Sequence, residues 1–247
     1  MRTAVKTCRL FFWSLVATIG LSLPAMAESI SLDIGDGGSA TGRIIQLIAL
    51  LTVLSLAPSI LIMVTSFTRI VVVLSFLRSA LGLQQTPPNA VLISLALFLT
   101  GFIMAPVIEQ SYKAGIAPLM KEEITETQAF DRTVAPIHKF MMDHVREHDL
   151  ALFMDMSKTT PTTPEATPLR ALVPAFMISE LRRAFEIGFL LFVPFLVIDM
   201  VVASILMSMG MMMLPPITIS LPFKLIFFVL VDGWYMVAGS LVRSFGT

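Results

Sequence analysis

Three side chains in the middle of the chain have types and a spacing suited to metal chemistry. His144, Glu147 and His148 form the pattern H-x-x-E-H, which is typical of inverted zinc peptidases. On one helix the two histidines share a face, as zinc ligation requires, and Glu147 is then the candidate base. The same charged segment also fits a solvated amphipathic helix, and no pattern marks a third ligand. A membrane zinc peptidase is therefore an alternative function that these residues leave open.

Methionine is concentrated near residue 210. Six of the 17 methionines lie between Met200 and Met213, and Met211, Met212 and Met213 are consecutive. Because consecutive helical residues point about 100° apart, such a triplet cannot form one buried face. In a loop, flexible thioether side chains can fill an irregular gap, and a ring of such loops makes an apolar constriction that holds back ions. The alternative is a methionine-rich apolar hinge, which composition alone favours.

Charged residues interrupt several strongly apolar stretches. They are Arg69, Asp199, Lys224 and Asp232. A lone charge at mid-membrane costs at least about 2.5–3.5 kcal/mol, so such a group should face protein, a partner charge or water. We consider a polar pathway or inter-subunit salt bridge on one side, and a structural pair within one subunit on the other. A proton-coupled transporter centred on Asp199 is a third hypothesis.

The composition indicates that a lipid bilayer surrounds the folded chain. Of the 247 residues 56% are hydrophobic and 14% are charged, whereas soluble domains contain about 25% charged residues. A protein of this size has too little interior to bury so much apolar surface. A soluble enzyme is therefore disfavoured, and 17 basic against 17 acidic residues leave no basic excess for a nucleic-acid partner. No nucleotide-binding fingerprint is present, so we expect no cofactor.

The first 27 residues have the features of a signal peptide. A basic segment precedes an apolar run from Leu10 to Leu23, and the small-residue site Ala25-Met26-Ala27 follows. The run is too short to cross about 30 Å of hydrocarbon comfortably. We expect cleavage between Ala27 and Glu28, which removes the only cysteine, Cys8, and leaves the new N-terminus outside the cytoplasm. An uncleaved first transmembrane helix is the alternative.

The remaining chain predicts an all-α integral membrane protein with four hydrophobic spans. A flexible lead (28–43) comes first, and the spans cover about residues 44–64, 89–108, 187–207 and 221–242. The first pair (44–108) and the second pair (187–247, with the methionine-rich loop) flank a polar extracytoplasmic helical region (109–186) that contains a Pro/Thr linker (157–168). Apolar sequence continues past the first span, and the third run contains Gly188 and Pro194. Both features favour broken or hairpin-folded helices that are buried in protein.

Several long motifs occur in the order typical of one known family. They are SFTRIVVVLSFLRSALGLQQTPPN at residues 66–89, PAFMISELRRAFEIGF at 174–189, PFLVIDMVVAS at 194–204, MGMMMLPP at 209–216 and VDGW at 231–234. With these motifs the chain resembles the FliP family of flagellar export-gate proteins, which shares its core with the YscR-like proteins of injectisomes. The resemblance covers essentially all of residues 44–245.

The resemblance implies a function that composition does not show. Proteins of this family form a homo-oligomeric, five-fold-like ring with FliQ-like and FliR-like subunits in the bacterial inner membrane, at the flagellar basal body. The ring is the entry channel of type III secretion and works with other export-gate proteins, and unfolded flagellar subunits pass through it. The resemblance implies hairpins that stack on protein, a pore gasket formed by Met211, Met212 and Met213, and no active site.

Overall fold

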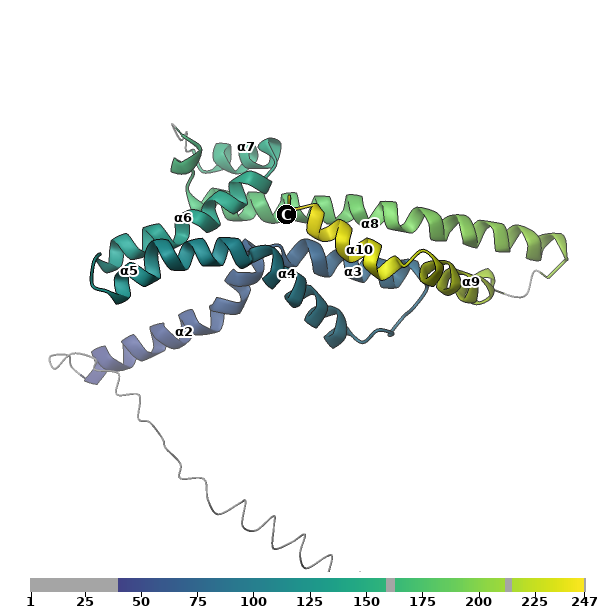
Figure 1. Ribbon diagram of the computed structural model, residues 1–247, viewed down its shortest axis with the longest axis horizontal. Coiled ribbons are helices and arrows are strands. Elements are labelled where there is room, and N and C mark those ends of the chain that lie inside the picture. The colour runs from purple at the N-terminus through teal and green to yellow at the C-terminus, as the bar shows by residue number, and fades with distance from the viewer. Residues whose placement is uncertain (1–39, 159–162, 212–214, 247) are drawn as a thin grey trace, which may run out of the picture. The chain divides into compact units, whose positions relative to one another are not determined.

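The structure is a computed structural model that describes residues 40–158, 163–211 and 215–246. Every regular element in this described part is helical, which confirms the all-α class (Figure 1). The signal peptide, its cleavage site and most of the lead lie outside the described residues. The helices are α2 (Ala40–Val64), α3 (Phe67–Ala80), α4 (Asn89–Ser111), η1 (Tyr112–Ile116), α5 (Ala117–Met120), α6 (Glu126–His144), α7 (Glu147–Met156), η2 (Pro164–Ala166), α8 (Leu169–Ser208), α9 (Pro216–Leu230) and α10 (Gly233–Arg243).

The chain divides into two compact units at a point within α2. The first unit comprises residues 1–52 and the second comprises residues 53–247. In the first unit the structure describes only the beginning of α2, where the large apolar side chains from Ile44 onward are exposed. The second unit contains the remaining described helices and all of the contacts discussed below.

The described helices include three that are long and apolar enough to cross a membrane. They are Ile44–Val64, Asn89–Met120 and Leu169–Ser208, and a fourth span is obtained if α9 and α10 together form one. The α9–α10 pair is bent by 63°. This arrangement confirms an integral membrane protein with hydrophobic spans, one of which is broken.

Helix α8 differs from the expected third span in length and continuity. It runs without interruption for 40 residues and contains both Pro174 and Pro194, so its length is about 60 Å. We expected the third run to be broken, but α3 and α9 pack along α8 (Figure 1) and the helix continues through both prolines. The break occurs instead in the fourth run, between α9 and α10. Residues 169–186, which the sequence places with the polar region, belong to the same helix as the third run.

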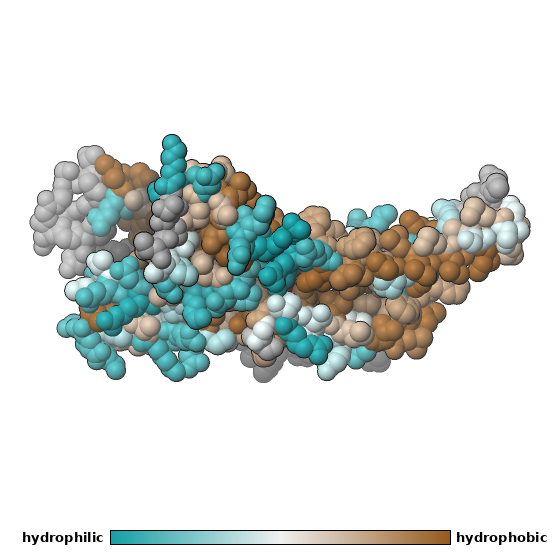
Figure 2. Space-filling model, turned by 90° about the horizontal axis from the view of Figure 1, so that it is seen from above, coloured by the Kyte–Doolittle hydropathy of each residue, from teal (hydrophilic) through white to brown (hydrophobic). Residues whose placement is uncertain are grey.

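Polar and apolar surfaces are separated along the second unit. In Figure 2 hydrophilic residues cover the region of α5, α6 and α7, whereas the far parts of α8 and α9 are largely hydrophobic. Helix α6 begins with Thr125 as its N-cap, whose hydroxyl accepts a hydrogen bond from the Gln128 amide. On the face shown in Figure 2, the second unit therefore has a hydrophilic end and a largely hydrophobic end.

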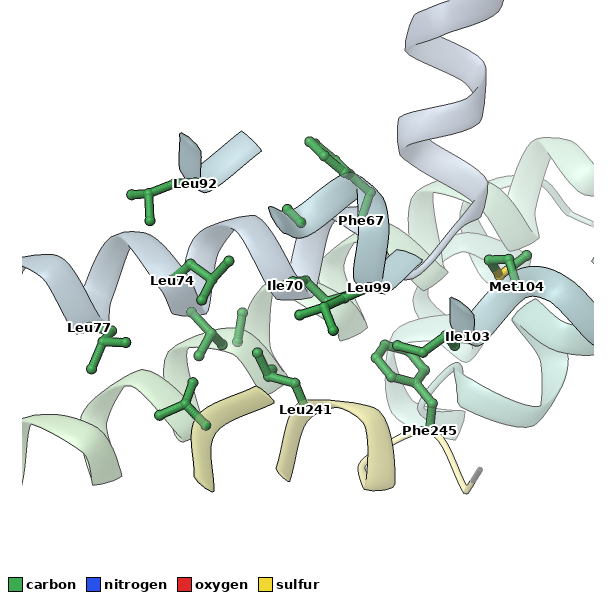
Figure 3. Close-up of a cluster of buried hydrophobic side chains, with 14 of the residues drawn as sticks. Phe67, Ile70, Leu74, Leu77, Leu92, Leu99, Ile103, Met104, Leu241 and Phe245 are labelled. Atoms are coloured by element: carbon green, nitrogen blue, oxygen red, sulfur yellow. The ribbon is translucent and has the colours of Figure 1, made fainter. Parts of the chain in front are cut away.

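Helix α3 is at the centre of the core. Helices α4, α8 and α10 supply the facing side chains. Leu99 and Ile103 of α4 and Leu241 of α10 are labelled in Figure 3. In lipid the apolar surroundings give no hydrophobic driving force between helices, so close van der Waals packing supplies the stabilisation. The buried apolar face of α3 repeats at helical spacing through Ile70, Val73, Leu74 and Leu77.

Gly188 allows α3 and α8 to approach each other closely. A Cβ atom at Gly188 would lie 2.5 Å from Cδ2 and 3.2 Å from Cβ of Phe76. The Phe76 ring is also held in edge contacts by Phe185 and Phe192, with centroid distances of 5.0 and 6.2 Å. Phe76 therefore has little room to move away from an added methyl group.

We expect Gly188→Ala to destabilise the protein by about 1–3 kcal/mol, because the methyl group overpacks this contact. The measurement is the melting temperature of the detergent-solubilised protein. Gly101→Ala is the matched control, since no atom lies within 4 Å of a Cβ at Gly101 in α4. Equal melting temperatures for the two variants would contradict the packing argument.

Candidate functional site

A buried ion pair joins the beginning of α3 to α8. The Nε atom of Arg69 donates to Glu180 Oε2 at 2.8 Å, and Nη2 donates to Oε1 of the same carboxylate. Both side chains are fully buried. The pair is bidentate, which is the strong geometry for a guanidinium and a carboxylate. The partner of Arg69 is therefore Glu180 of the same chain, a residue that no sequence pattern indicated.

The same guanidinium fixes the C-terminal end of the described chain. Nη1 of Arg69 donates to the hydroxyl and the carbonyl of Ser244 at 2.9 and 3.2 Å. Its Cζ atom lies 3.7 Å from the centroid of the Phe245 ring, a cation–π contact. One side chain thus connects α3, α8 and the segment after α10. The signal that pointed to a partner for Arg69 was its position in an apolar run, but nothing local identified Glu180.

A second ion pair lies between α8 and α9. Nζ of Lys224 is 2.6 Å from Asp199 Oδ2 and 3.2 Å from the carbonyl oxygen of Ala80, the last residue of α3. The Ser220 hydroxyl donates to Asp199 Oδ1 at 2.5 Å. Lys224 therefore satisfies one of the carbonyl groups that a helix leaves unpaired at its C-terminus, where a cation is favoured. The structure thus pairs Asp199 with Lys224 in the same chain, which is the arrangement of a structural pair within one subunit.

Asp232 is placed differently from the other three charged residues. It is exposed and stands in the left-handed conformation (φ 50°) between α9 and α10. Within the described part of the chain it joins neither of the two ion pairs. Its backbone carbonyl accepts a hydrogen bond from the amide of Met236, which lies in the first turn of α10. The structure therefore places Asp232 at the break in the fourth run.

The H-x-x-E-H motif does not lie on one helix. His144 is the last residue of α6 and Glu147 is the first residue of α7, and the two residues between them are extended. The break is stabilised by α8, because the Ser179 hydroxyl accepts from the Arg146 amide at 3.1 Å and donates to Asp149 at 2.8 Å. The expectation that His144 and His148 share a helix face is therefore wrong.

The histidine side chains have separate surroundings. Nδ1 of His144 is 2.7 Å from the Phe140 carbonyl oxygen, and its ring packs on Phe140 and Phe245, whereas the His148 side chain is 86% exposed. Among the residues that the structure describes, no group of three His, Cys, Asp or Glu side chains could hold a metal ion. The zinc-peptidase alternative therefore has no support in the geometry.

We expect Glu147→Gln and His148→Ala to leave the melting temperature and the zinc content of the purified protein at the wild-type level. Glu147 is exposed at the start of α7 and His148 is almost fully exposed, so neither change creates a cavity. The measurements are the melting temperature and the zinc content of the purified protein. Stoichiometric zinc in the wild-type protein that is lost in the His148→Ala variant would contradict this expectation.

The methionine-rich segment begins where α8 ends. Gly210 has a φ of +73°, its amide donates to the Met207 carbonyl at 3.1 Å, and the Met211 amide donates to the Leu206 carbonyl at 3.0 Å. This is a Schellman motif with glycine at the left-handed position. Met211 is therefore outside the helix, as the triplet argument requires, and its side chain is exposed. Met212 and Met213 lie outside the described residues.

Comparison with known proteins agrees with the motifs. The model of the FliP family matches residues 50–241. "Flagellar biosynthetic protein FliP" of Caulobacter vibrioides is 64% identical over 223 residues, which are 90% of this chain and 84% of that protein. The proteins of the same name from Rhizobium meliloti (53% over 237 residues; 94% and 97%) and Bacillus subtilis (54% over 221 residues; 89% and 100%) are also similar. The chain belongs to the FliP family.

Proposed function

We propose that the chain is a channel-forming subunit of the flagellar type III export gate. It assembles with copies of itself in a five-fold-like ring, together with FliQ-like and FliR-like subunits, in the inner membrane at the flagellar basal body. Unfolded flagellar subunits pass through the ring, and the chain acts as a conduit and not as an enzyme. The observation that carries this proposal is the match to the FliP family over residues 50–241.

The distribution of charge in the second unit supports an assembled state. Arg69 and Asp199 are neutralised by partners within the chain, so neither adds an unpaired charge to the outer faces of the apolar helices. Those faces expose large side chains on α8, among them Phe189 and Leu190 at 67% each. Exposed apolar patches of this kind mark contacts with protein or membrane, and both lipid and neighbouring subunits are available to cover them.

The proposed topology follows from the signal peptide. Cleavage between Ala27 and Glu28 leaves the lead (28–43) outside, and we propose that the polar region (109–186) also lies outside and the methionine-rich connection inside. Because Arg69 bonds Glu180 and Ser244, the beginning of α3 lies on the same side as the polar region, so α2 does not make a simple crossing in this topology. Helix α8, at about 60 Å, is about twice the 30 Å thickness of the hydrocarbon. Part of it must therefore pack on protein or project from the bilayer, which supports stacked hairpins within a larger assembly.

Deletion of the gene and complementation test the proposal. We expect the deletion strain to secrete no flagellar subunits into the medium, and the wild-type gene to restore both secretion and motility. Purification in mild detergent should recover the chain as an oligomer with FliQ-like and FliR-like subunits. A motile deletion strain, or a chain that purifies as a stable monomer, would contradict the proposal.

A further inference from the structure

A groove lies on the surface of the second unit, between α4 and α10. It has a volume of about 410 Å³. The aromatic side chains along it are largely exposed, with Phe98 at 72%, Phe102 at 62% and Tyr235 at 74%. Exposed apolar patches of this kind mark contacts with protein, membrane or an apolar ligand. Its lining consists of Phe98, Leu99 and Phe102 from α4, and Tyr235, Ala238, Gly239, Val242 and Arg243 from α10.

Arg243 is the charged residue in this lining. Its Nε atom donates to the Gly239 carbonyl at 3.2 Å, and its Nη2 atom lies 3.5 Å from the position that a Cβ at Gly239 would take. The guanidinium is therefore held above the floor of the groove instead of extending freely into solvent. Within the described residues Arg243 forms no ion pair, in contrast to Arg69 and Arg182.

The position of Arg243 along the chain places its charge at a membrane interface. It is the first charged residue after the fourth predicted run (221–242), and the proposed topology has this end outside the cytoplasm. Basic residues in short segments are favoured on the cytoplasmic side. An arginine on the opposite side without an acidic partner in the chain is best satisfied by an anion from its surroundings.

We propose that the groove binds an anionic phospholipid of the surrounding bilayer. The phosphate lies on the Arg243 guanidinium, whose planar fork matches phosphate oxygens, and one acyl chain lies along Phe98 and Phe102. Tyr235 borders the same groove, and tyrosine side chains are enriched at membrane–water interfaces. This inference rests on the membrane topology of the proposed function but not on channel activity.

Lipid retention by the purified complex tests the proposal. Native mass spectrometry of the full complex, with added phosphatidylglycerol or phosphatidylcholine, measures retention of each lipid. We expect the wild type to retain phosphatidylglycerol preferentially, and Arg243→Gln to weaken this retention about tenfold, which corresponds to the loss of one charge-assisted hydrogen bond. Arg182→Gln is the control, because it removes an exposed arginine from another helix. Equal retention of phosphatidylglycerol by wild type and Arg243→Gln would overturn the proposal.

A second variant tests the acyl-chain position. Gly239 has open space at its Cβ position apart from the Arg243 guanidinium, so Gly239→Leu fills the groove floor and favours the helix. We expect it to reduce retention of both lipids while secretion of flagellar subunits continues. If Gly239→Leu instead releases a FliQ-like or other protein subunit and leaves lipid retention unchanged, the groove seats a partner helix and the lipid assignment is wrong. Failure of the lipid site shows as unchanged lipid retention in these variants, whereas failure of the proposed function shows as secretion by the deletion strain, so the two failures are distinguishable.

Discussion

Replacing Met211, Met212 and Met213 together with alanine is expected to leave the complex assembled but to make the membrane permeable to small ions. A thioether side chain is long and unbranched and adapts to the shape of whatever it surrounds. A methyl group cannot span the same gap, so a constriction lined by alanine stays wetted, and wetted constrictions conduct. The Schellman motif at Gly210 ends α8 before this segment, so the substitution should not disturb the helix.

Two measurements separate leakage from misassembly. A membrane-potential dye in growing cells reports ion leakage, and co-purification of the FliQ-like and FliR-like subunits reports assembly. Met120→Ala and Met156→Ala are controls, because both side chains are exposed, at 74% and 70%, and lie on other helices. Wild-type ion permeability in cells that contain the assembled triple variant would contradict the proposal that these three methionines form a pore gasket.

Glu180→Ala is expected to abolish assembly. It leaves the fully buried Arg69 guanidinium without its carboxylate, and an uncompensated buried charge costs about 3–5 kcal/mol. That is a large fraction of the about 5–15 kcal/mol by which proteins are stable. The Arg69 contacts to Ser244 and Phe245 would be weakened as well, so the end of α10 should detach from α3.

A double variant separates the effect of the buried charges from the effect of side-chain volume. Arg69→Met combined with Glu180→Leu removes both charges and keeps volume, and such replacements are often neutral. We therefore expect the double variant to recover much of the protein level and melting temperature that Glu180→Ala loses. Arg182→Ala removes one partner of an exposed pair with Glu186, which is worth about 0–1 kcal/mol. A double variant as unstable as Glu180→Ala would show that the pair is needed for more than charge balance.

Local patterns predicted the elements of this protein well where their physical cause is local. The first two runs predicted helices that begin close to Ile44 and Asn89, because long uncharged apolar stretches must satisfy their backbone within a helix. Two consecutive prolines, Pro87 and Pro88, cannot continue a helix, and the structure has no regular helix between Ala80 and Asn89. Gly210, likewise, marks the end of α8 because only glycine adopts φ of +73° without strain.

Interactions between distant residues decided the candidate site. Arg69 and Glu180 are 111 residues apart, and the sequence showed only that Arg69 needed a partner. The break between His144 and Glu147 depends on Ser179 in another helix, so a local motif suggested a metal site that the backbone does not form.

The sequence by itself determined the solvent, the helical class and the family of this protein, because apolar composition and motif order are properties of the chain as written. Tertiary structure alone decided which charged residues form ion pairs and that α8 continues through Pro194. It also decided that Lys224 of α9 contacts both Asp199 of α8 and the end of α3. The reason is that a buried charge can be neutralised by any suitable partner, and packing selects that partner after the helices have formed.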